Sequence, residues 1–218
     1  MSEAPKIAVT NVLLGIVITI SILSIVYLPF KTFALYILAM SIFHFLEYFI
    51  TAIYKPEDAH FDSFLLNHSR AYLCAFLASI LEYICESTIL SSMKLPQLVS
   101  HLGLVLVIIG QLFRSNAMIT AGVNFSHIIQ EEKQKDHKLV TSGIYSIVRH
   151  PSYSGFFIWS IGTQLLLGNP LCSMTYLIVT WKYFKDRIRY EEVFLAEFFR
   201  GEYEKYRENV SSGIPFIK

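Results

Sequence analysis

Residues 7–28 of the chain read IAVTNVLLGIVITISILSIVYL, a run without a single charged side chain. About 20 consecutive apolar residues are enough for a helix to cross the hydrocarbon core of a bilayer. The run is longer than the apolar region of a secretory signal peptide, and no small-residue cleavage site follows it. We therefore expect a retained membrane-spanning helix near the start of the chain.

Further apolar segments repeat this pattern along the sequence. Three segments of similar length cover residues 32–54, 71–90 and 98–121, and two shorter ones cover residues 153–167 and 171–184. Gly168, Asn169 and Pro170 separate the two shorter segments, and these residue types favour a turn. The last two segments are therefore predicted to form a helical hairpin.

The composition agrees with this pattern. The chain is 54% hydrophobic and 16% charged, with a mean hydropathy of +0.48, against about 25% charged residues in a soluble domain. We predict an all-α integral membrane protein of one domain, residues 1–218, with about six transmembrane helices. Four spans lie within residues 7–121, followed by a polar loop (residues 122–152), the hairpin (residues 153–184) and a tail (residues 185–218).

The positions of the cationic residues predict the orientation in the membrane. With six spans, the loop, the tail and both termini share one side, and only Lys31 and Lys94 of the 18 Lys and Arg residues lie on the other. The positive-inside rule makes the side with the remaining 16 (18 − 2) cytosolic. The tail mixes aromatic and charged residues at helical spacing, so we expect an interfacial helix there. The net charge of +1 gives no reason to expect a nucleic-acid partner.

The end of the loop and the start of the hairpin carry the strongest chemical signal, HKLVTSGIYSIVRHPSYSG at residues 137–155. Gly143 permits a left-handed turn, and Pro151 suits the first turn of a helix. The free N–H groups of that turn can donate hydrogen bonds to a carboxylate or ribose oxygen of a ligand. The stretch is therefore a candidate ligand site.

Aromatic rings in the same stretch indicate the kind of ligand. Tyr145, His150 and Tyr153 are expected to face one pocket, where adenine can stack and a sulfonium cation is attracted to the ring faces. This arrangement favours an adenosyl cofactor. The alternative is that the tyrosines belong to an aromatic belt and that Arg149 is a snorkelling anchor at the membrane boundary.

Arg187 and Glu191 lie one helical turn apart, directly after the hairpin. Such spacing is typical of a surface ion pair, which is the alternative interpretation. Their position at the membrane edge favours a function, because a cation there can hold a substrate carboxylate and an anion can hold a cofactor ammonium. The sequence has no G-x-G-x-x-G motif after a strand, which excludes a Rossmann-type methyltransferase domain.

Ionisable residues also occur inside the predicted spans, namely His44, Glu47, Glu82 and Glu86. Buried polar groups need partners, so we expect them to pair with one another or with Arg114 and to fasten helices together. A di-iron carboxylate site needs Glu-x-x-His on each of two helices, whereas here the order is His44-x-x-Glu47 and it occurs once. We predict no metal site.

Taken together, these motifs resemble the isoprenylcysteine carboxyl methyltransferase family. The resemblance rests on NFSHIIQ at residues 124–130, residues 137–140, Gly143, Tyr145, residues 149–153, Arg187, Glu191, Glu192 and the ending GIPFIK at residues 213–218. Upstream it includes Phe43, His44, Glu47, residues 62–69 and Arg114, so it covers most of the chain. Some animal members have extra spans before the position of Ile7, and the chain is more similar to the shorter, six-span members.

The resemblance implies a site for S-adenosyl-L-methionine, released as S-adenosyl-L-homocysteine. The implied cofactor residues are Gln130, His137, Lys138, Leu139, Val140, Tyr145, His150, Pro151, Ser152, Tyr153 and Glu191. Arg187 is implied on the side of the substrate carboxylate, and Arg187 and Glu191 are the expected catalytic residues. The implied reaction is direct, in-line methyl esterification of the C-terminal prenylcysteine α-carboxylate at the boundary between membrane and cytosol.

The implied partners are proteins that end in a farnesyl- or geranylgeranyl-cysteine, such as Ras-like small GTPases. The implied location is the endoplasmic reticulum membrane, with the active site and both termini cytosolic. The turn at residues 149–155 also resembles phospholipid N-methyltransferases and NADPH-dependent sterol reductases. A reductase would need further basic residues for the NADPH phosphates, and a non-enzymatic scaffold or channel would bind no cofactor.

The predicted topology can be tested by glycosylation. Asn67, Asn124 and Asn209 each begin an N-x-S sequon, and the topology places all three in the cytosol, away from the lumenal glycosylation machinery. We expect none of them to carry a glycan when the protein is expressed in eukaryotic cells. A mass shift that is sensitive to a glycosidase would overturn the topology.

Overall fold

The computed structural model describes residues 3–29, 31–66, 69–89, 94–135 and 137–218. The chain forms the helices α1 (Ala4–Tyr27), α2 (Lys31–Tyr54), α3 (Arg70–Thr88), α4 (Gln97–Ala121), α5 (Pro151–Leu167), α6 (Pro170–Phe198) and α7 (Glu202–Asn209). Short 3-10 helices are η1 (Pro56–Asp58), η2 (Phe61–Phe64), η4 (Gly122–Asn124) and η5 (Gly143–Ser146). Among the described residues, the only β pairing is an isolated bridge between Val148 and Ser211. The all-helical prediction is confirmed.

The four predicted N-terminal spans coincide with α1 to α4, and all four helices are long and apolar enough to cross a membrane. The agreement is close because the first three apolar runs end near a proline or a lysine, and the fourth ends at Gly122, where the helix also stops. Residues 67 and 68, which begin the first sequon, lie outside the described residues. Spans formed by α5 and α6 remain a prediction, as does the total of six.

The predicted hairpin is present, but its second helix is longer than expected. Gly168 adopts the left-handed conformation (φ 78°) after α5, and Pro170 is the first residue of α6. The prediction placed a boundary at residue 184, whereas α6 continues to Phe198. Strong helix formers follow Phe184 and no glycine occurs before Gly201, so nothing in the sequence interrupts the helix where its apolar character ends.

Glycines allow α4 and α5 to pack backbone against backbone. A Cβ atom on Gly110 of α4 would lie 2.5 Å from the backbone nitrogen of Trp159, and one on Gly155 of α5 would lie 2.6 Å from that of Arg114. Such close approach through small residues is common between membrane helices, where packing rather than the hydrophobic effect holds helices together. The contact fixes the start of α5, and with it the predicted ligand stretch, against the end of α4.

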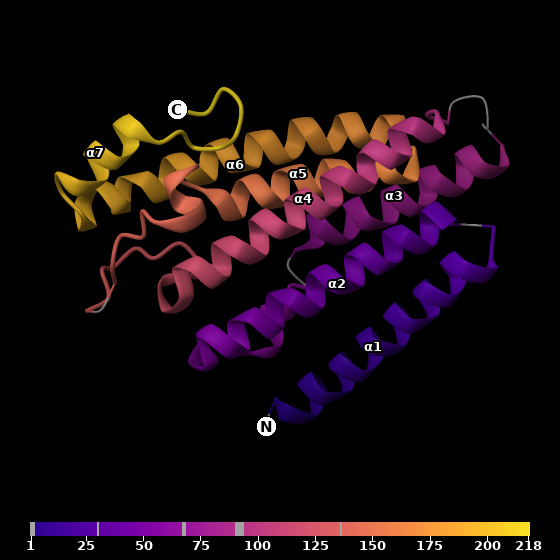
Figure 1. Ribbon diagram of the computed structural model, residues 1–218, viewed down its shortest axis with the longest axis horizontal. Helices are drawn as coiled ribbons and strands as arrows, with labels where there is room; N and C mark the ends of the chain where they lie inside the picture. Colours follow the sequence, from indigo (N-terminus) through magenta and orange to yellow (C-terminus); the bar gives the residue numbers. More distant parts are fainter. Residues whose placement is uncertain (1–2, 30, 67–68, 90–93, 136) are drawn as a thin grey trace.

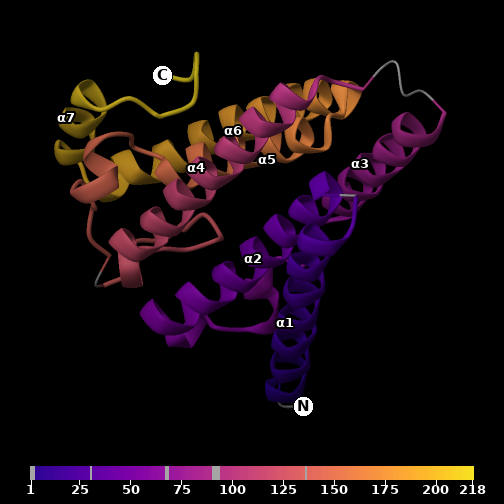
Figure 2. The same cartoon turned by 45° about the vertical axis from the view of Figure 1, so that its right-hand side comes forward.

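The helices gather the loop and the tail at one end of the bundle. Figures 1 and 2 show α4, α5 and α6 side by side, with α7 and the segment between α4 and α5 at the same end. The backbone N–H groups of Arg149 and His150 donate to the carbonyls of Ser211 and Ser212 at 2.8 and 3.2 Å. The C-terminal segment therefore covers the start of α5.

We expect Gly110→Ala to destabilise the protein, because the added methyl group would overlap the backbone of α5. Overpacking of this kind costs about 1–3 kcal/mol, which should lower the melting temperature in detergent by several degrees. Gly15→Ala in α1 is the matched control, since a Cβ atom there meets nothing within 4 Å. Equal melting temperatures for the two variants would contradict the packing described here.

Candidate functional site

A cavity lies at the end of the bundle where the loop, the start of α5, α6 and α7 meet. Counted with its open mouth, the space has a volume of about 700 Å³. Its lining includes all of the predicted cofactor residues except Gln130, namely His137, Lys138, Leu139, Val140, Tyr145, His150, Pro151, Ser152, Tyr153 and Glu191. We call this space the polar cavity.

Gln130 is the exception among the predicted residues. It lines a neighbouring hollow together with Lys55, Asp58 and His137, and its side-chain amide donates to Ser126 Oγ at 3.1 Å. The structure thus brings together the predicted residues from position 137 onward and places Gln130 beside the cavity rather than in its wall.

The aromatic rings of the motif meet at this cavity, as predicted. The rings of His150 and Tyr153 stack with centroids 5.5 Å apart and an interplanar angle of 5°. Tyr145 lies in η5, which follows the left-handed Gly143 (φ 58°), and its backbone carbonyl accepts a 2.5 Å hydrogen bond from Tyr206 Oη. The belt interpretation therefore does not describe these residues.

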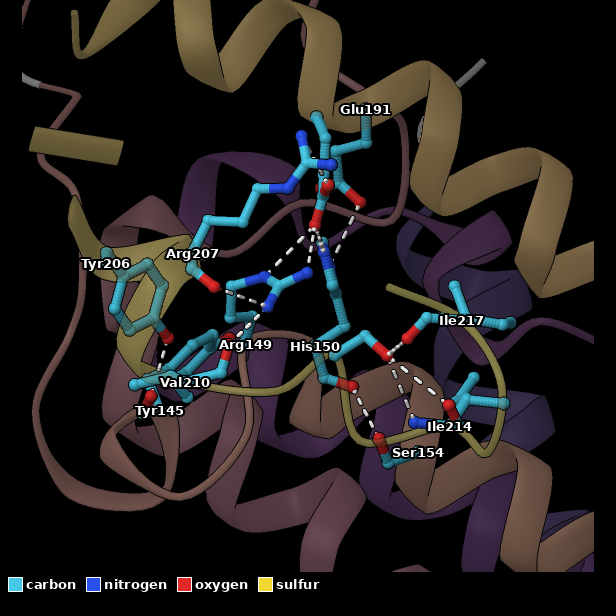
Figure 3. A network of polar contacts seen from close by, with 12 residues as sticks. Tyr145, Arg149, His150, Ser154, Glu191, Tyr206, Arg207, Val210, Ile214 and Ile217 are labelled. Atoms are coloured by element: carbon cyan, nitrogen blue, oxygen red, sulfur yellow. Dashed lines mark hydrogen bonds and ion pairs between the residues drawn. The ribbon is translucent and has the colours of Figure 1, made fainter. Parts of the chain in front are cut away.

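Arg149 is buried beneath the cavity and is not a snorkelling anchor. Its guanidinium donates to Glu192 Oε1 from Nε and Nη2 at 3.1 and 3.0 Å, and Nη1 donates to the carbonyl of Val210. His150 Nε2 lies 3.1 Å from the same carboxylate oxygen, and Arg207 lies 3.5 Å from the other. Figure 3 shows Arg149 and His150, which directly precede α5, converging with Arg207 of α7. This network ties the start of α5 to α6 and the tail.

The network changes the ionisation of Glu192. Burial alone would raise the pKa of this carboxyl, but the hydrogen bond with His150 and the charge of Arg149 outweigh burial and lower the pKa to about 2. Glu192 is therefore ionised at any physiological pH. Sequence analysis associated Glu192 with the family motif but gave it no role, because its partners lie more than 40 residues away in the sequence.

Three residues of the cavity wall have a buried polar atom that makes no hydrogen bond within the described part of the chain, and one of these atoms, Glu191 Oε2, lies 3.7 Å from His150 Nδ1. Within the described residues, His137 Nδ1, Glu191 Oε2 and Tyr203 Oη have no hydrogen-bond partner. Burial, together with the charges of Lys133 and Lys55, lowers the pKa of His137, so its ring is neutral at pH 7. Buried polar groups are normally paired, and an unpaired set facing one cavity indicates a polar ligand. Tyr203 was missed because the tail gave only an amphipathic pattern.

Arg187 lines a second cavity and does not pair with Glu191. Its Nε donates to Tyr153 Oη at 2.8 Å and its Nη2 to the carbonyl of His127 at 2.7 Å, and Nη1 lies 3.3 Å from Tyr183 Oη. In the described part of the chain no ion pair joins Arg187 to Glu191. The surface ion pair that the spacing allowed is therefore not the arrangement found.

The second cavity encloses about 590 Å³ and is mostly apolar. Its lining is Phe43, Leu65, Tyr72, Arg114, Phe125, Ser126, His127, Ser152, Tyr153, Phe156, Tyr183, Phe184 and Arg187. Phe125, Ser126, Ser152 and Tyr153 also line the polar cavity, so the two spaces adjoin. We call this space the apolar cavity; Arg187 is at its polar end.

Of the ionisable residues inside the spans, Glu47 pairs with Arg114 as predicted, whereas Glu82 binds backbone groups and, within the described residues, the carboxylate of Glu86 has no hydrogen-bond partner. Arg114 of α4 donates to both carboxylate oxygens of Glu47 of α2 at 2.7 and 2.8 Å, and His127 Nε2 lies 2.7 Å from Glu47 Oε2. Glu82 of α3 accepts the backbone N–H groups of Leu171 and Cys172 at 2.7 Å each. It therefore caps the start of α6.

Comparison with known proteins gives consistent matches. A family model described as the isoprenylcysteine carboxyl methyltransferase (ICMT) family matches residues 102–197. Protein-S-isoprenylcysteine O-methyltransferase of Saccharomyces cerevisiae is 48% identical over 97% of this chain and 91% of its own length. The Homo sapiens protein of that name is 44% identical over 98% of this chain and 75% of its own.

A solved structure is also similar. The eukaryotic intramembrane Ras methyltransferase ICMT superposes with a TM-score of 0.93 at 41% sequence identity. The match covers 97% of this chain and 76% of that one. The helical arrangement described above is therefore that of an experimentally determined membrane enzyme.

We expect Glu192→Gln to lower the melting temperature at pH 7 by several degrees, because it leaves Arg149 buried without its anion. The folded pKa of about 2 lies below the ordinary value of 4.5, so the stability from this carboxylate is complete above pH 4.5 and is lost as the pH falls through 2. The difference between wild type and variant should therefore stay constant from pH 7 to pH 5 in detergent melts. Glu208→Gln, on the exposed side of α7, is the control, and a difference that disappeared by pH 5 would contradict the assignment.

Proposed function

The chain belongs to the isoprenylcysteine carboxyl methyltransferase family, and we propose that its two adjoining cavities bring a methyl donor and a prenylcysteine carboxylate together. The observation that supports this division is the shared wall at Ser152 and Tyr153. On one side of that wall lies a polar cavity with unpaired polar atoms, and on the other an apolar cavity that ends at Arg187. The enzyme methylates the terminal carboxyl group of isoprenylcysteine.

The proposed methyl donor is S-adenosyl-L-methionine, bound in the polar cavity. Its sulfonium group supplies a methyl cation equivalent to a nucleophile. The carboxylate of Glu191, whose Oε2 makes no hydrogen bond within the described residues, can bind the ligand's ammonium, and His137 Nδ1 and Tyr203 Oη, which also lack hydrogen-bond partners there, can bind its polar atoms. The stacked rings of His150 and Tyr153 give a surface that attracts a cation. The residues present therefore fit this cofactor.

The carboxylate of the substrate needs orientation rather than activation. A terminal carboxyl has a pKa of about 3.3–3.7, so it is an anion at neutral pH and requires no general base. A guanidinium has five N–H groups, and three hydrogen bonds hold Arg187 at the end of the apolar cavity. The remaining N–H groups can grip the carboxylate for an in-line approach. Reaction of an anion with a cation is favoured where water is excluded.

The apolar cavity suits the prenyl chain. Phe43, Phe156 and Phe184 line it at membrane depth, and burial of each methylene contributes about 0.8 kcal/mol. A prenylated substrate is already dissolved in the bilayer, so we propose that it enters sideways between helices while the cofactor enters from the cytosol. Proteins ending in farnesyl- or geranylgeranyl-cysteine, including Ras-like small GTPases, are the proposed partners.

The proposed location is the endoplasmic reticulum membrane, with six spans and with the active site and both termini cytosolic. The positive-inside census supports this orientation. The comparisons favour neither a phospholipid methyltransferase nor a sterol reductase, because the matching proteins are named for isoprenylcysteine.

Two variants separate substrate positioning from cofactor binding. Arg187→Lys keeps the charge but loses the planar fork that holds two carboxylate oxygens. We expect it to bind S-adenosylhomocysteine normally in calorimetric titrations, while methyl transfer to a prenylcysteine substrate falls roughly tenfold or more. Glu191→Gln should instead weaken cofactor binding, because it removes the anion from the polar cavity.

Thermal melts in detergent show that each variant is folded. Loss of cofactor binding by Arg187→Lys together with normal binding by Glu191→Gln would reverse the two roles. Full activity in both variants would show that Arg187 and Glu191 are surface residues without a role in substrate positioning or cofactor binding.

A further inference from the structure

A hollow lies on the side of α6 opposite the two cavities. It encloses about 1100 Å³ with its open mouth and is lined by Lys185, Arg189, Glu192, Val193, Ala196, Arg207, Phe216, Ile217 and Lys218. Lys185, Arg189 and Val193 follow one another a turn apart on α6. Arg187 follows Lys185 by two residues, and Glu191 follows Arg189 by two. Each member of the proposed catalytic pair therefore lies roughly 200° around the helix from the cation before it. One helix therefore presents the proposed catalytic pair to one side and a cationic row to the other.

The hollow carries positive charge that the chain does not neutralise. Cations converge on it from α6 (Lys185, Arg189), α7 (Arg207) and the C-terminal segment (Lys218). Among the described lining residues, Glu192 has a carboxylate side chain, which is already bound by the buried network beneath the polar cavity, and the α-carboxylate of Lys218 adds one further negative charge against the four cationic side chains. In the part of the chain that the structure describes, the two lysines and Arg189 have no ion-pair partner. This charge distribution suits an anion.

The same hollow exposes apolar side chains. Phe216 is 95% exposed and Val193 is 63% exposed, and Phe216 adopts a left-handed backbone conformation (φ 65°), which is rare for a bulky residue. The backbone in this segment does not bury the ring but directs it outward. An exposed aromatic ring among cations is typical of a surface that contacts lipid.

The depth of the hollow matches the headgroup region of a bilayer. The C-terminal segment turns back along α6 (Figure 1), and Trp181 Nε1 donates to the carbonyl of Pro215 at 2.8 Å. Lys185 Nζ lies 4.9 Å from the centre of the Trp181 ring. Phe216 is thus held near the point where α6 changes from apolar to charged, between Phe184 and Lys185. Tryptophan and lysine at such a point mark the membrane interface.

We propose that this hollow binds the headgroup of an anionic phospholipid of the surrounding membrane, such as phosphatidylserine, with Phe216 and Val193 against the upper part of its acyl chains. A zwitterionic lipid would leave the cations unneutralised, and a soluble anion would not use the exposed ring. The site is separate from the methyl-transfer site and rests on the proposed position of this end of α6 at the membrane boundary. Anionic lipids attract cations near the membrane surface by about 1 kcal/mol per charge.

Tryptophan fluorescence can test the proposal. The chain has two tryptophans; Trp159 is buried in the helix bundle, 3% exposed, and Trp181 lies beside the hollow. A Trp159→Phe variant leaves Trp181 as the fluorophore. The protein is placed in micelles of unbrominated phosphatidylcholine and detergent. Phosphatidylserine or phosphatidylcholine with brominated acyl chains is then added, and the quenching of Trp181 by the two lipids is compared. We expect phosphatidylserine to quench severalfold more strongly. Replacing Lys185 and Arg189 by glutamine should abolish this preference, because each cation near an anionic lipid surface contributes about 1 kcal/mol, roughly fivefold.

The matched control removes the same charge outside the hollow. Arg200 and Lys205 are exposed cations at the same end of the molecule, and their double glutamine variant should keep the preference. Equal quenching by the two lipids in the Trp159→Phe protein would overturn the proposal. An equal loss of the preference for phosphatidylserine in both double variants would also overturn the proposal, because it would show a diffuse effect of charge. A double variant with Arg189→Gln and Lys218→Gln keeps Lys185, which contacts Trp181. It gives a second measurement of the preference for phosphatidylserine. Methyl transfer measured in the same samples reports separately on the proposed function.

Discussion

The buried ion pair between Glu47 and Arg114 is the constraint on which the rest of the site depends. Glu47 is 1% exposed and Arg114 7% exposed, inside a bundle whose outer surface is apolar. An unpaired charge at such depth costs several kcal/mol, so each residue requires the other. The bidentate geometry, 2.7 and 2.8 Å, also requires a particular depth and rotation of α2 against α4. A pair of this kind specifies the arrangement of helices more than it adds to stability.

The ion pair extends by hydrogen bonds to Arg187. Glu47 also binds the ring of His127, and the carbonyl of His127 accepts from Arg187. On the other side, Arg114 donates to Ser152, next to Tyr153, whose hydroxyl accepts from Arg187 Nε. Two of the three hydrogen bonds that hold the proposed substrate-binding cation, those to Tyr153 and His127, are therefore connected to one buried ion pair. This explains how a loop without regular structure can present His127 at a defined position.

Sequence predicted the features that depend on neighbouring residues. The spans α1 to α4 follow from uninterrupted apolar runs, and the turn at Gly168 follows from its residue types. The stretch from His137 to Tyr153 was predicted to contribute to one pocket because its members are close in the sequence, and its predicted cofactor residues line the polar cavity. Features that depend on distant residues were not found: Glu192 beneath the pocket, and Tyr203 folded over it from α7. Gln130 lies beside the polar cavity rather than in its wall, and its position depends on the path of the loop, which no periodic pattern specifies.

The continuity of α6 past Phe184 sets the spacing of its residues that line the two cavities, and with it the proposed depth of the site in the membrane. A helix rises about 1.5 Å per residue, so Arg187 lies roughly 4.5 Å and Glu191 roughly 10 Å beyond the last apolar residue of the hairpin. A carboxylate attached to a membrane-dissolved prenyl chain resides at this shallow depth, whereas a charged, water-soluble methyl donor resides further out. Because one unbroken helix carries both residues, with Arg187 lining the apolar cavity and Glu191 the polar one, the distance between the two ligand sites cannot change with the tilt of a separate tail. A break at residue 184, as the change in composition predicted, would have removed that constraint, and the helix formers that follow Phe184 are what maintain it.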